Sequence, residues 1–419
     1  MAELFENEQP AERVILVGVK AGPKDPVEAS LDELAELAGT AGAVCVGRLI
    51  QSREGMHPGT YIGKGKLEEL RELILELAAD AVICDDELSP AQMANMADAL
   101  ETKVLDRTVL ILDIFAGRAS TREGRLQVEL AQLRYRATRL VGMRASLSRL
   151  GGGIGTRGPG EKKLEIDRRL IRDRISQLRR ELEDVETHRA VARQSRKRNE
   201  IPVAAIVGYT NAGKSTLLNV LTDAGVLEED KLFATLDPTT RNLTLESGQQ
   251  VLLTDTVGFI HKLPHHLVES FKSTLEEARY ADLLIHVVDA SDPQMAMHMY
   301  VVYQTLEELG VENKTVITCF NKIDLLPPDA DLSGLRDMRA DVSLLTAFRQ
   351  GQGTEPLMAA LEEELRAGQL LIERTFGYEK AGAIAVIRKY GQLLAEEYRA
   401  DGIYVKAYVP KEIYARIEF

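Results

Sequence analysis

The sequence has few cysteines, which form the disulfides of secreted proteins, and it lacks the long apolar segments that cross membranes. Its 419 residues contain no tryptophan and three cysteines, Cys45, Cys84 and Cys319. Because the cysteines are odd in number and form no CxxC pair, we expect buried, reduced thiols rather than a disulfide or a metal site. The acidic N-terminus lacks the apolar core of a signal peptide, and no run approaches the roughly 20 apolar residues of a membrane span. These absences predict a cytoplasmic protein.

The chain also lacks an overall positive charge, which at first argues against a nucleic acid partner. It carries 65 acidic and 52 basic side chains, a net charge of −13. The charge is segregated, however. Residues 118–200 hold 22 basic and 11 acidic side chains, whereas segments 1–117 and 201–419 each carry a net charge of −12. A basic block of this size is typical either of contact with RNA phosphates or of a solvated, charged helix.

Apolar periodicity predicts an α/β protein with four domains. Residues 1–117 alternate strand-like and helix-like runs and predict an N-terminal parallel α/β domain. Residues 118–200 predict a basic, antiparallel helical hairpin with a glycine-rich tip, because apolar residues recur at helical spacing on both sides of that tip. Residues 201–366 return to alternating strand-like and helix-like runs and predict a second α/β domain, and residues 367–419 predict a small α+β domain.

Two local patterns within these domains can be tested against the structure. The first is ambiguous, and the second is specific. The segment 382–390 fits either a helix or a strand, because it is a short apolar run that ends at a glycine. Ser120-Thr121-Arg122-Glu123 matches a capping box, which places Ser120 at the start of the first hairpin helix.

A phosphate-binding loop follows the strand-like run 203–207. Residues 208–215 read GYTNAGKS, match G-x-x-x-x-G-K-[ST] and precede a helical run. Backbone N–H groups of such a loop wrap a phosphate, and the helix N-terminus adds its positive end. Lys214 would reach the β- and γ-phosphates, and Ser215 would bind Mg²⁺. The predicted phosphate-binding residues are Gly208, Tyr209, Thr210, Asn211, Ala212, Gly213, Lys214, Ser215 and Thr216.

A second motif predicts guanine as the base. It comprises Asn321, Lys322, Ile323 and Asp324, and it ends the apolar strand-like run 315–320. A carboxylate at Asp324 can accept hydrogen bonds from guanine N1–H and from the 2-amino group, which adenine does not offer in that geometry. Asn321 would tie this loop to the phosphate loop, and the stem of Lys322 would lie along the base. The last part of the base loop is expected at Leu345, Thr346 and Ala347.

Two further segments are predicted to contact Mg²⁺ and the γ-phosphate. After a strand-like run, Asp255 would hold Mg²⁺ through water, and the Gly258 N–H would sense the γ-phosphate; Thr256 and Val257 lie between them. The switch loop before that strand must supply a hydroxyl group to Mg²⁺ when it closes. Spacing alone leaves Thr235, Thr239 and Thr240 open for this role. The predicted nucleotide contacts of this loop are Phe233, Ala234, Thr235, Leu236 and Asp237.

Phe259 occupies the position at which Ras-like GTPases place a glutamine that orients the attacking water. A phenylalanine cannot hydrogen-bond water, so another group must position it. Together the motifs predict that residues 201–366 form a P-loop GTPase domain, and Phe259 predicts that its intrinsic hydrolysis is slow. The candidate catalytic residues are Lys214, Thr235 and Gly258, and the candidate Mg²⁺ ligands are Ser215, Thr235 and Asp255.

The motifs jointly resemble the HflX family of translation-factor-related GTPases over residues 13–366. The stretches that carry the resemblance are Tyr61–Lys66, Asp85–Ser89, Leu112–Ala119, Gln127–Leu133, and the glycine tip running into Glu161-Lys162-Lys163. The resemblance implies a GTP hydrolase that binds the large ribosomal subunit and splits or rescues stalled ribosomes, with hydrolysis stimulated by the ribosome. It also implies that Thr235, in the family's F-x-T-L, is the Mg²⁺ threonine. Thr346 replaces the family's usual serine but keeps the hydroxyl group.

With this resemblance, the basic hairpin becomes a candidate for contact with ribosomal RNA. The candidate contact residues around its tip are Arg149, Arg157, Lys162 and Lys163. We expect a monomer with no membrane span, and Mg²⁺ as the cofactor with GTP as the substrate. Two alternatives remain: a GTP-switched RNA- or ribosome-binding module that hydrolysis only resets, and a GTPase that acts on non-ribosomal RNA. Residues 63–66, GKGK, are too short for a P-loop and favour a structural turn over a second nucleotide or RNA contact.

Overall fold

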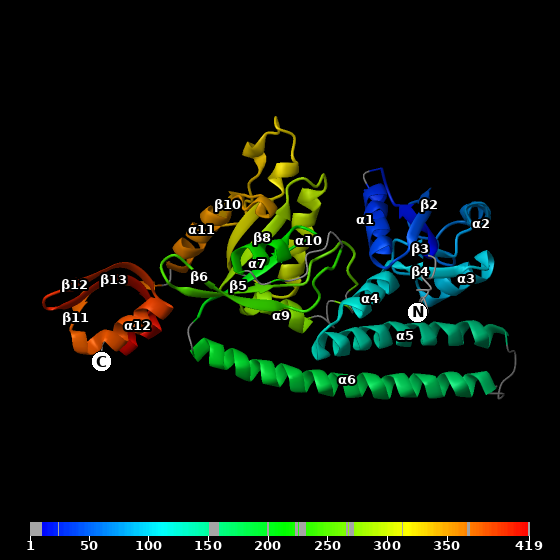
Figure 1. The fold of residues 1–419 in the computed structure, drawn as a ribbon. Helices are drawn as coiled ribbons and strands as arrows, with labels where there is room; N and C mark the ends of the chain where they lie inside the picture. The colour runs from blue at the N-terminus through cyan, green and yellow to red at the C-terminus, as the bar shows by residue number, and fades with distance from the viewer. Residues whose placement is uncertain are drawn as a thin grey trace, which may run out of the picture. The chain divides into compact units, whose positions relative to one another are not determined.

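The structure, a computed structural model, describes residues 11–23, 25–150, 159–198, 201–222, 225, 232–264, 267, 272–311, 313–366 and 369–417. The chain forms two compact units. The first comprises Met1–Glu183 and His261–Ser270, and the second comprises Asp184–Ile260 and Phe271–Phe419. Figure 1 labels many of the helices and strands of both units. The mixed α/β fold that the sequence predicts is confirmed, and each unit is described by itself below.

The N-terminal part of the first unit is a four-stranded, parallel α/β fold, as predicted. Its strands are β1 (Arg13–Lys20), β2 (Val44–Ser52), β3 (Ala81–Cys84) and β4 (Lys103–Asp106), in the order β2-β1-β3-β4. Its helices are α1 (Val27–Thr40), α2 (Lys64–Leu77), α3 (Pro90–Leu100) and α4 (Arg107–Arg118), the last of which we did not predict. β3 is buried along its whole length, so its apolar run needs no alternation. Such a parallel sheet brings the carboxyl ends of its strands to one edge.

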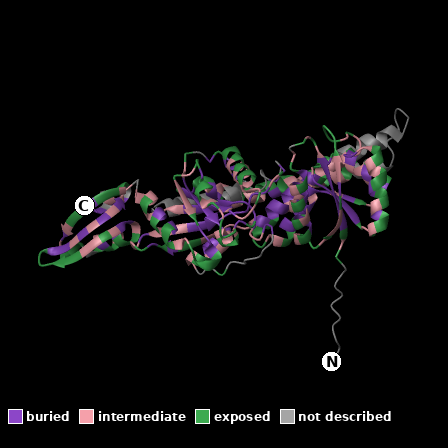
Figure 2. Cartoon of the chain, turned by 90° about the horizontal axis from the view of Figure 1, so that it is seen from above, coloured by how far each residue is buried: buried purple, intermediate pink, exposed green. Residues whose placement is uncertain are grey.

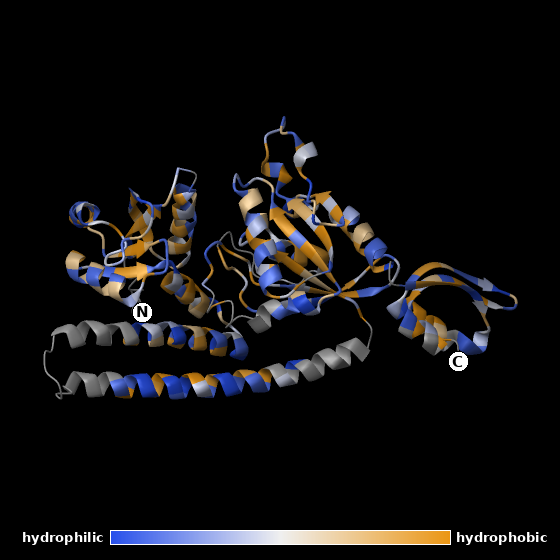
Figure 3. Ribbon diagram, turned by 180° about the vertical axis from the view of Figure 1, so that it is seen from behind, coloured by the Kyte–Doolittle hydropathy of each residue, from blue (hydrophilic) through white to orange (hydrophobic). Residues whose placement is uncertain are grey.

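The basic block forms two long helices, α5 (Arg122–Leu150) and α6 (Pro159–Arg198). The ion pairs Arg122–Glu181 and Glu129–Arg174 run in opposite senses along the two helices, which makes the pair antiparallel. A small apolar cluster of Leu126, Leu130 and Leu178 lies between them. Figure 3 shows that the described part of α6 is mostly hydrophilic. Residues 151–158, which include Arg157, lie outside the described residues, and for Arg149, Lys162 and Lys163 only helical backbone is described.

The start of α5 differs from the prediction by one residue. The Thr121 hydroxyl accepts a hydrogen bond from the Gly124 N–H at 3.0 Å. Thr121 therefore caps α5, which begins at Arg122, one residue later than a helix capped by Ser120 would begin. A complete capping box does occur at α3, where Ser89 and Gln92 bond reciprocally.

The second unit contains a six-stranded sheet in the order β10-β9-β8-β5-β7-β6. Its strands are β5 (Val203–Gly208), β6 (Thr239–Thr244), β7 (Gln250–Asp255), β8 (Leu283–Asp289), β9 (Thr315–Asn321) and β10 (Val342–Leu345). β6 pairs with β7 in the antiparallel sense, and the other pairings are parallel. The helices are α7 (Lys214–Thr222), α9 (Lys272–Tyr280), α10 (Met295–Glu308) and α11 (Thr354–Arg366), with short 3-10 turns at Ile323–Leu325, Leu332–Gly334 and Phe348–Gln350.

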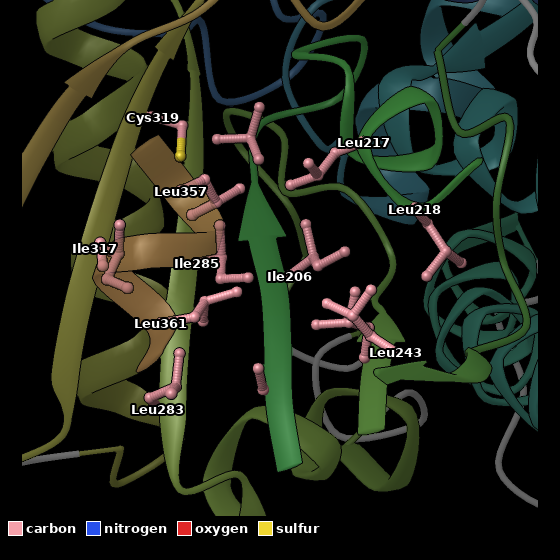
Figure 4. Close-up of a cluster of buried hydrophobic side chains, with 14 of the residues drawn as sticks. Ile206, Leu217, Leu218, Leu243, Leu283, Ile285, Ile317, Cys319, Leu357 and Leu361 are labelled. Carbon is pink, nitrogen blue, oxygen red and sulfur yellow. The ribbon is translucent and has the colours of Figure 1, made fainter. Parts of the chain in front are cut away.

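The core of this unit lies between the sheet and helices α7 and α11. Figure 4 shows Ile206 and Ile285 from the sheet facing Leu217 of α7 and Leu357 and Leu361 of α11. All five side chains are fully buried. Burying apolar area on this scale is the main stabilising contribution to such a fold. Figure 2 shows the same pattern along the chain, with buried residues concentrated in the sheets.

The C-terminal part is a three-stranded antiparallel sheet with two helices. Its elements are β11 (Gln369–Phe376), a 3-10 turn (Tyr378–Lys380), α12 (Ala381–Tyr390), β12 (Gln392–Arg399), β13 (Gly402–Pro410) and α13 (Lys411–Ile417), with sheet order β11-β13-β12. The segment that the sequence left open, 382–390, is a helix. β12 and α13 were not predicted.

The cysteines are free thiols, as expected. Cys84 and Cys319 are buried, but Cys45 is only half-buried, so the prediction of burial is wrong for Cys45. Its strand, β2, lies at the edge of the sheet, where one side has no neighbouring strand. Of the described helices, none combines the length and the apolarity needed to cross a bilayer.

Candidate nucleotide-binding site

The phosphate loop connects β5 to α7 at the carboxyl edge of the six-stranded sheet. Two of its glycines are required by close contacts. A Cβ atom on Gly208 (φ +155°) would lie 2.2 Å from the Val287 carbonyl oxygen, and one on Gly213 (φ +102°) would lie 2.3 Å from Asn321 Nδ2. Both have φ values that other residues rarely adopt. The sequence motif therefore reflects two tight passages of the backbone.

The loop is also connected to the predicted base loop. Asn321 Nδ2 donates a hydrogen bond to the Ala212 carbonyl at 2.9 Å, and Asn321 Oδ1 accepts one from the Phe348 N–H at 3.0 Å. Asn321 is almost fully buried, so both bonds are shielded from water. One side chain thus links the phosphate loop to the segment after β10.

The base loop is built from two segments that meet at the end of β9. The Thr346 N–H donates to the Phe320 carbonyl at 2.8 Å, and Thr346 and Ala347 are buried. Lys322 (φ +63°) pairs with Asp289 at 2.7 Å, and Asp324 remains exposed and accepts a hydrogen bond from Gln350 Nε2 at 3.1 Å. Ile323 begins the 3-10 turn, and Leu345 ends β10. The carboxylate that would read guanine is thus accessible and held by a side chain that sequence reasoning missed.

Three oxygen atoms from three separate segments meet beside the phosphate loop. Ser215 Oγ lies 2.8 Å from Thr235 Oγ1 and 2.8 Å from Asp255 Oδ2. Asp255 Oδ1 is buried and has no hydrogen-bond partner among the described residues. Mg²⁺ prefers oxygen ligands at closely spaced, octahedral positions, so these residues fit the ion. Among the described residues, histidine, cysteine and carboxylate side chains do not form a group of three that could hold a metal by themselves.

The structure also separates the three threonines that spacing left open. Thr239 and Thr240 lie in β6, and Thr240 Oγ1 is 2.9 Å from Thr254 Oγ1 of the neighbouring strand. Thr235 is the one that reaches Ser215. Around it, Phe233 (φ +56°) and Leu236 are buried, whereas Ala234 and Asp237 are half-buried.

The segment after β7 packs directly on the phosphate loop. The Phe259 N–H donates to the Gly208 carbonyl at 3.1 Å, and the Thr210 N–H donates to the Phe259 carbonyl at 2.8 Å. Phe259 is 1% exposed, so its ring belongs to the core of the loop. A Cβ atom on Gly258 would lie 2.9 Å from Thr210 Cα and 3.0 Å from Lys214 Nζ. Thr256 Oγ1 donates to the Ile206 carbonyl, which fixes the start of this segment.

These groups line a cavity of about 190 Å³. The predicted residues that line it are Thr210, Asn211, Gly213, Lys214, Ser215, Thr216, Phe233, Ala234, Thr235, Gly258, Asn321, Lys322 and Asp324. Arg349 and Phe348 line it too and were not predicted. Lys214 is buried and donates to the Tyr209 carbonyl at 2.6 Å, and burial lowers the pKa of Lys214 to about 8. A cation beside several backbone N–H groups makes this cavity suited to phosphate.

A stacking contact between α10 and the phosphate loop was not predicted from the sequence. The rings of Tyr209 and His298 stack with centroids 3.7 Å apart, and His298 pairs with Asp292 at 3.5 Å. Burial lowers the pKa of His298, with Asp292 opposing the shift, so the imidazole is neutral when it stacks at neutral pH. The spacing of these residues gave no signal, because α10 brings His298 to the loop only in the folded chain.

Comparisons with known proteins agree with the features described above. Three family models match in succession: a GTP-binding GTPase N-terminal region at residues 28–116, a GTP-binding GTPase middle region at 118–196, and a 50S ribosome-binding GTPase at 203–322. A protein named GTPase HflX from Lacrimispora saccharolytica is 64% identical and covers 100% of this chain and 98% of its own length. GTPase HflX from Escherichia coli K12 is 43% identical over 86% of this chain and 85% of its own. A solved GTP-binding protein from Sulfolobus solfataricus in complex with GDP is 23% identical, with a TM-score of 0.43 over 84% of this chain and 98% of its own.

Proposed function

The chain belongs to the HflX family of GTPases, and on this basis we propose that it binds the large ribosomal subunit and splits or rescues stalled ribosomes. The supporting observation is the match of its nucleotide-binding region to a 50S ribosome-binding GTPase, in a chain whose long helical pair is strongly basic. Cations on that pair would neutralise RNA phosphates. We propose a cytoplasmic monomer with domain boundaries at residues 1–117, 118–200, 201–366 and 367–419.

The site geometry supports a division of labour in GTP hydrolysis. Ser215, Thr235 and Asp255 would hold Mg²⁺, which supplies positive charge to the β- and γ-phosphates. Lys214 would stabilise the same phosphates, and the Gly258 N–H would contact the γ-phosphate. Asp324 would read guanine. Preorganised charge of this kind is usually the largest catalytic contribution.

The buried Phe259 favours stimulation by the ribosome over fast intrinsic turnover. Because Phe259 is fixed in the core of the phosphate loop, it offers no polar atom to the attacking water. The same observation supports the alternative, a GTP-switched binding module that hydrolysis only resets. A GTPase acting on non-ribosomal RNA would also share this site.

Sucrose-gradient sedimentation of ribosomes with the purified chain separates these proposals. We expect subunits to appear from assembled ribosomes with GTP, and the chain to travel with the large subunit. Splitting that persists with a non-hydrolysable GTP analogue would favour the switch, whereas splitting that requires turnover would favour the hydrolase. If the chain travels with no ribosomal particle, the ribosomal proposal is wrong. Hydrolysis measured with and without large subunits tests stimulation directly.

The proposed RNA contacts can be tested in the same gradients. Replacing Arg157, Lys162 and Lys163 by alanine should impair splitting and leave GTP binding intact, because the described residues that line the nucleotide cavity belong to other segments of the chain. Alanine at Lys20, Arg71 and Lys103, which form exposed ion pairs elsewhere in the first unit, is the matched control. Equal splitting by both triple variants would argue against the hairpin tip as an RNA contact.

A further inference from the structure

Guanine carries a strong acceptor next to the groups that Asp324 would read. Asp324 would accept hydrogen bonds from guanine N1–H and from the 2-amino group. The ring atom beside N1 carries O6, and both O6 and the nearby N7 are acceptors. An acceptor that leaves water without gaining a new donor costs free energy. A site that binds guanine tightly therefore needs a hydrogen-bond donor beside Asp324.

The backbone N–H groups of the segment after β10 are already used within the protein. The Ala347 N–H donates to the Gln352 carbonyl at 3.1 Å, and the Phe348 N–H donates to Asn321 Oδ1 at 3.0 Å. Guanine O6 could take either N–H group only by sharing it or by breaking a bond that holds the base loop together. A side-chain donor satisfies O6 without that cost.

Arg349 follows this segment and lines the same cavity as Asp324. It lies in the 3-10 turn after Ala347, and reciprocal backbone hydrogen bonds between Ala347 and Gln352, at 3.1 and 3.2 Å, close the loop that contains the turn. The next residue, Gln350, donates to Asp324 Oδ2 at 3.1 Å. The backbone of Arg349 is therefore held one residue away from the partner of the base-reading carboxylate.

The guanidinium group of Arg349 differs from the cations of Lys214 and Lys322, which also line the cavity. Lys214 Nζ donates to the Tyr209 carbonyl at 2.6 Å, and Lys322 Nζ pairs with Asp289 at 2.7 Å. The exposed side chain of Arg349 has neither a hydrogen bond nor an ion pair with the described residues. Its N–H donors are thus available to a ligand in the cavity.

The two neighbours of Arg349 are less suited to this contact. Phe348 is 1% exposed, packs in the core of the second unit and has no polar side-chain atom. Gln350 does not line the cavity, and its amide is bound to Asp324. A guanidinium group, by contrast, can present two parallel N–H groups to guanine O6 and N7, which is the commonest way in which proteins contact this edge of the base.

We propose that Arg349 is a guanine-specificity residue whose guanidinium group donates to O6 of the bound nucleotide. Asp324 and Arg349 then divide the base between them, because the carboxylate takes the donors of guanine and the guanidinium group takes its acceptors. Adenine carries an amino group in place of O6, so it would set one donor against another. The proposal deepens the proposed reading of guanine at Asp324, on which it rests.

The test compares the affinity of full-length variants for GDP and for 6-thio-GDP by competition binding. The second ligand keeps N1–H and the 2-amino group but replaces O6 by sulfur, which accepts hydrogen bonds weakly. In Arg349→Ala we expect GDP affinity to fall about tenfold and 6-thio-GDP affinity to fall about twofold at most. Arg349→Lys keeps the charge without the planar fork and should recover part of the GDP affinity.

Arg336→Ala is the matched control, because it removes an exposed arginine of the same unit that does not line the cavity. It should bind both ligands like wild type. Equal losses of GDP and 6-thio-GDP affinity in Arg349→Ala would overturn the proposal, since the arginine would then contact the ribose, a phosphate or only the face of the base. Unchanged GDP affinity in Arg349→Ala would overturn it as well.

Inosine diphosphate tests the underlying placement of the base at Asp324 separately. It keeps O6 and N1–H but lacks the 2-amino group, so wild type should bind it more weakly than GDP. Arg349→Ala should lower its affinity by the same factor as that of GDP, because both ligands carry O6. If wild type binds inosine diphosphate and GDP equally, Asp324 does not read the 2-amino group, and the placement on which the proposal rests is wrong.

Discussion

Ser215 Oγ and Thr235 Oγ1 lie 2.8 Å apart although Thr235 comes twenty positions after Ser215 in the chain. Ser215 is the second residue of α7, and Thr235 lies in the loop before β6. Asp255 Oδ2, at the end of β7, is 2.8 Å from the same serine oxygen. Three oxygens at such spacing match the edges of an octahedral Mg²⁺ shell. The structure therefore places the Thr235 hydroxyl group beside Ser215, where it could serve as a third oxygen ligand.

The position of Thr235 beside Ser215 predicts a specific loss in Thr235→Ala. Removing one oxygen ligand should weaken GTP binding in the presence of Mg²⁺ by about tenfold and leave GDP binding within about twofold, because the switch threonine acts only in the GTP-bound arrangement. Calorimetric titration with each nucleotide, with Mg²⁺ and with EDTA, measures this. Thr239→Ala, in β6, is the control and should behave like wild type. Equal losses for GTP and GDP would contradict the assignment.

The exposed carboxylate of Asp324 predicts a change of base preference in Asp324→Asn. A carboxylate accepts two hydrogen bonds from guanine, whereas the asparagine amide offers one acceptor and one donor, which matches the 2-carbonyl of xanthine. We expect GTP affinity to fall about a hundredfold or more and xanthosine triphosphate to become the tighter ligand, measured by competition binding. Gln350→Ala removes only the exposed partner of Asp324 and should change GTP affinity about twofold at most. Unchanged preference would exclude Asp324 as the base reader.

A buried polar network in the second unit predicts a dependence of stability on pH. Asp337 accepts hydrogen bonds from Tyr303 OH at 2.6 Å and Thr318 Oγ1 at 2.7 Å, and His286 Nδ1 lies 3.8 Å away. Burial lowers the pKa of His286 below its usual 6.5, although Asp337 opposes the shift. Burial opposes ionisation of Asp337, but the nearby imidazole of His286 and the hydrogen bonds from Tyr303 and Thr318 outweigh it and lower the pKa of Asp337.

Both shifts destabilise the fold in acid. The unfolded chain protonates its histidine before the folded chain does, so the contribution of His286 to stability is lost as the pH falls below about 6.5. The contribution of Asp337 is present above about pH 3.8 and is lost as the pH falls further. We expect the melting temperature to decline from about pH 7.5 to about pH 5.5, and His286→Asn to flatten that decline. The same slope in the variant would contradict the role of His286.

Much of the fold followed from local sequence patterns, and the exceptions have physical causes. The apolar runs of β1, β3 and β9 identified buried parallel strands because such strands need no polar alternation. β12, with the sequence QLLAEEYR, carries charged and apolar residues without a clear period and was missed. α12 could not be assigned from sequence because ten residues with a short apolar run fit either period, and its packing on β13 decides the matter.

In the candidate site, too, some features could be predicted from the sequence and others could not. Its backbone motifs could be predicted because loop, helix start and glycine positions are neighbours in sequence. Partners that arrive from other elements could not be predicted, as with Gln350 on Asp324 and Asp289 on Lys322, because no local pattern encodes a tertiary contact. Lys262 is the clearest case. It pairs with Asp85 and Asp86, and Asp85 lies 177 positions before it in the chain.

The close packing of Gly258 on the phosphate loop predicts that even a methyl group there will impair hydrolysis. A Cβ atom would lie 2.9 Å from Thr210 Cα and 3.0 Å from Lys214 Nζ, and the backbone of Thr210 cannot give way without moving the phosphate loop. Gly258→Ala must therefore displace its own N–H from the γ-phosphate position. We expect the hydrolysis rate constant to fall by about a hundredfold and GTP affinity to fall more than GDP affinity. Gly65→Ala, where the added methyl group meets no atom within 4 Å, is the matched control and should keep the wild-type rate. Wild-type hydrolysis by Gly258→Ala would show that this backbone position has no contact with the reacting phosphate.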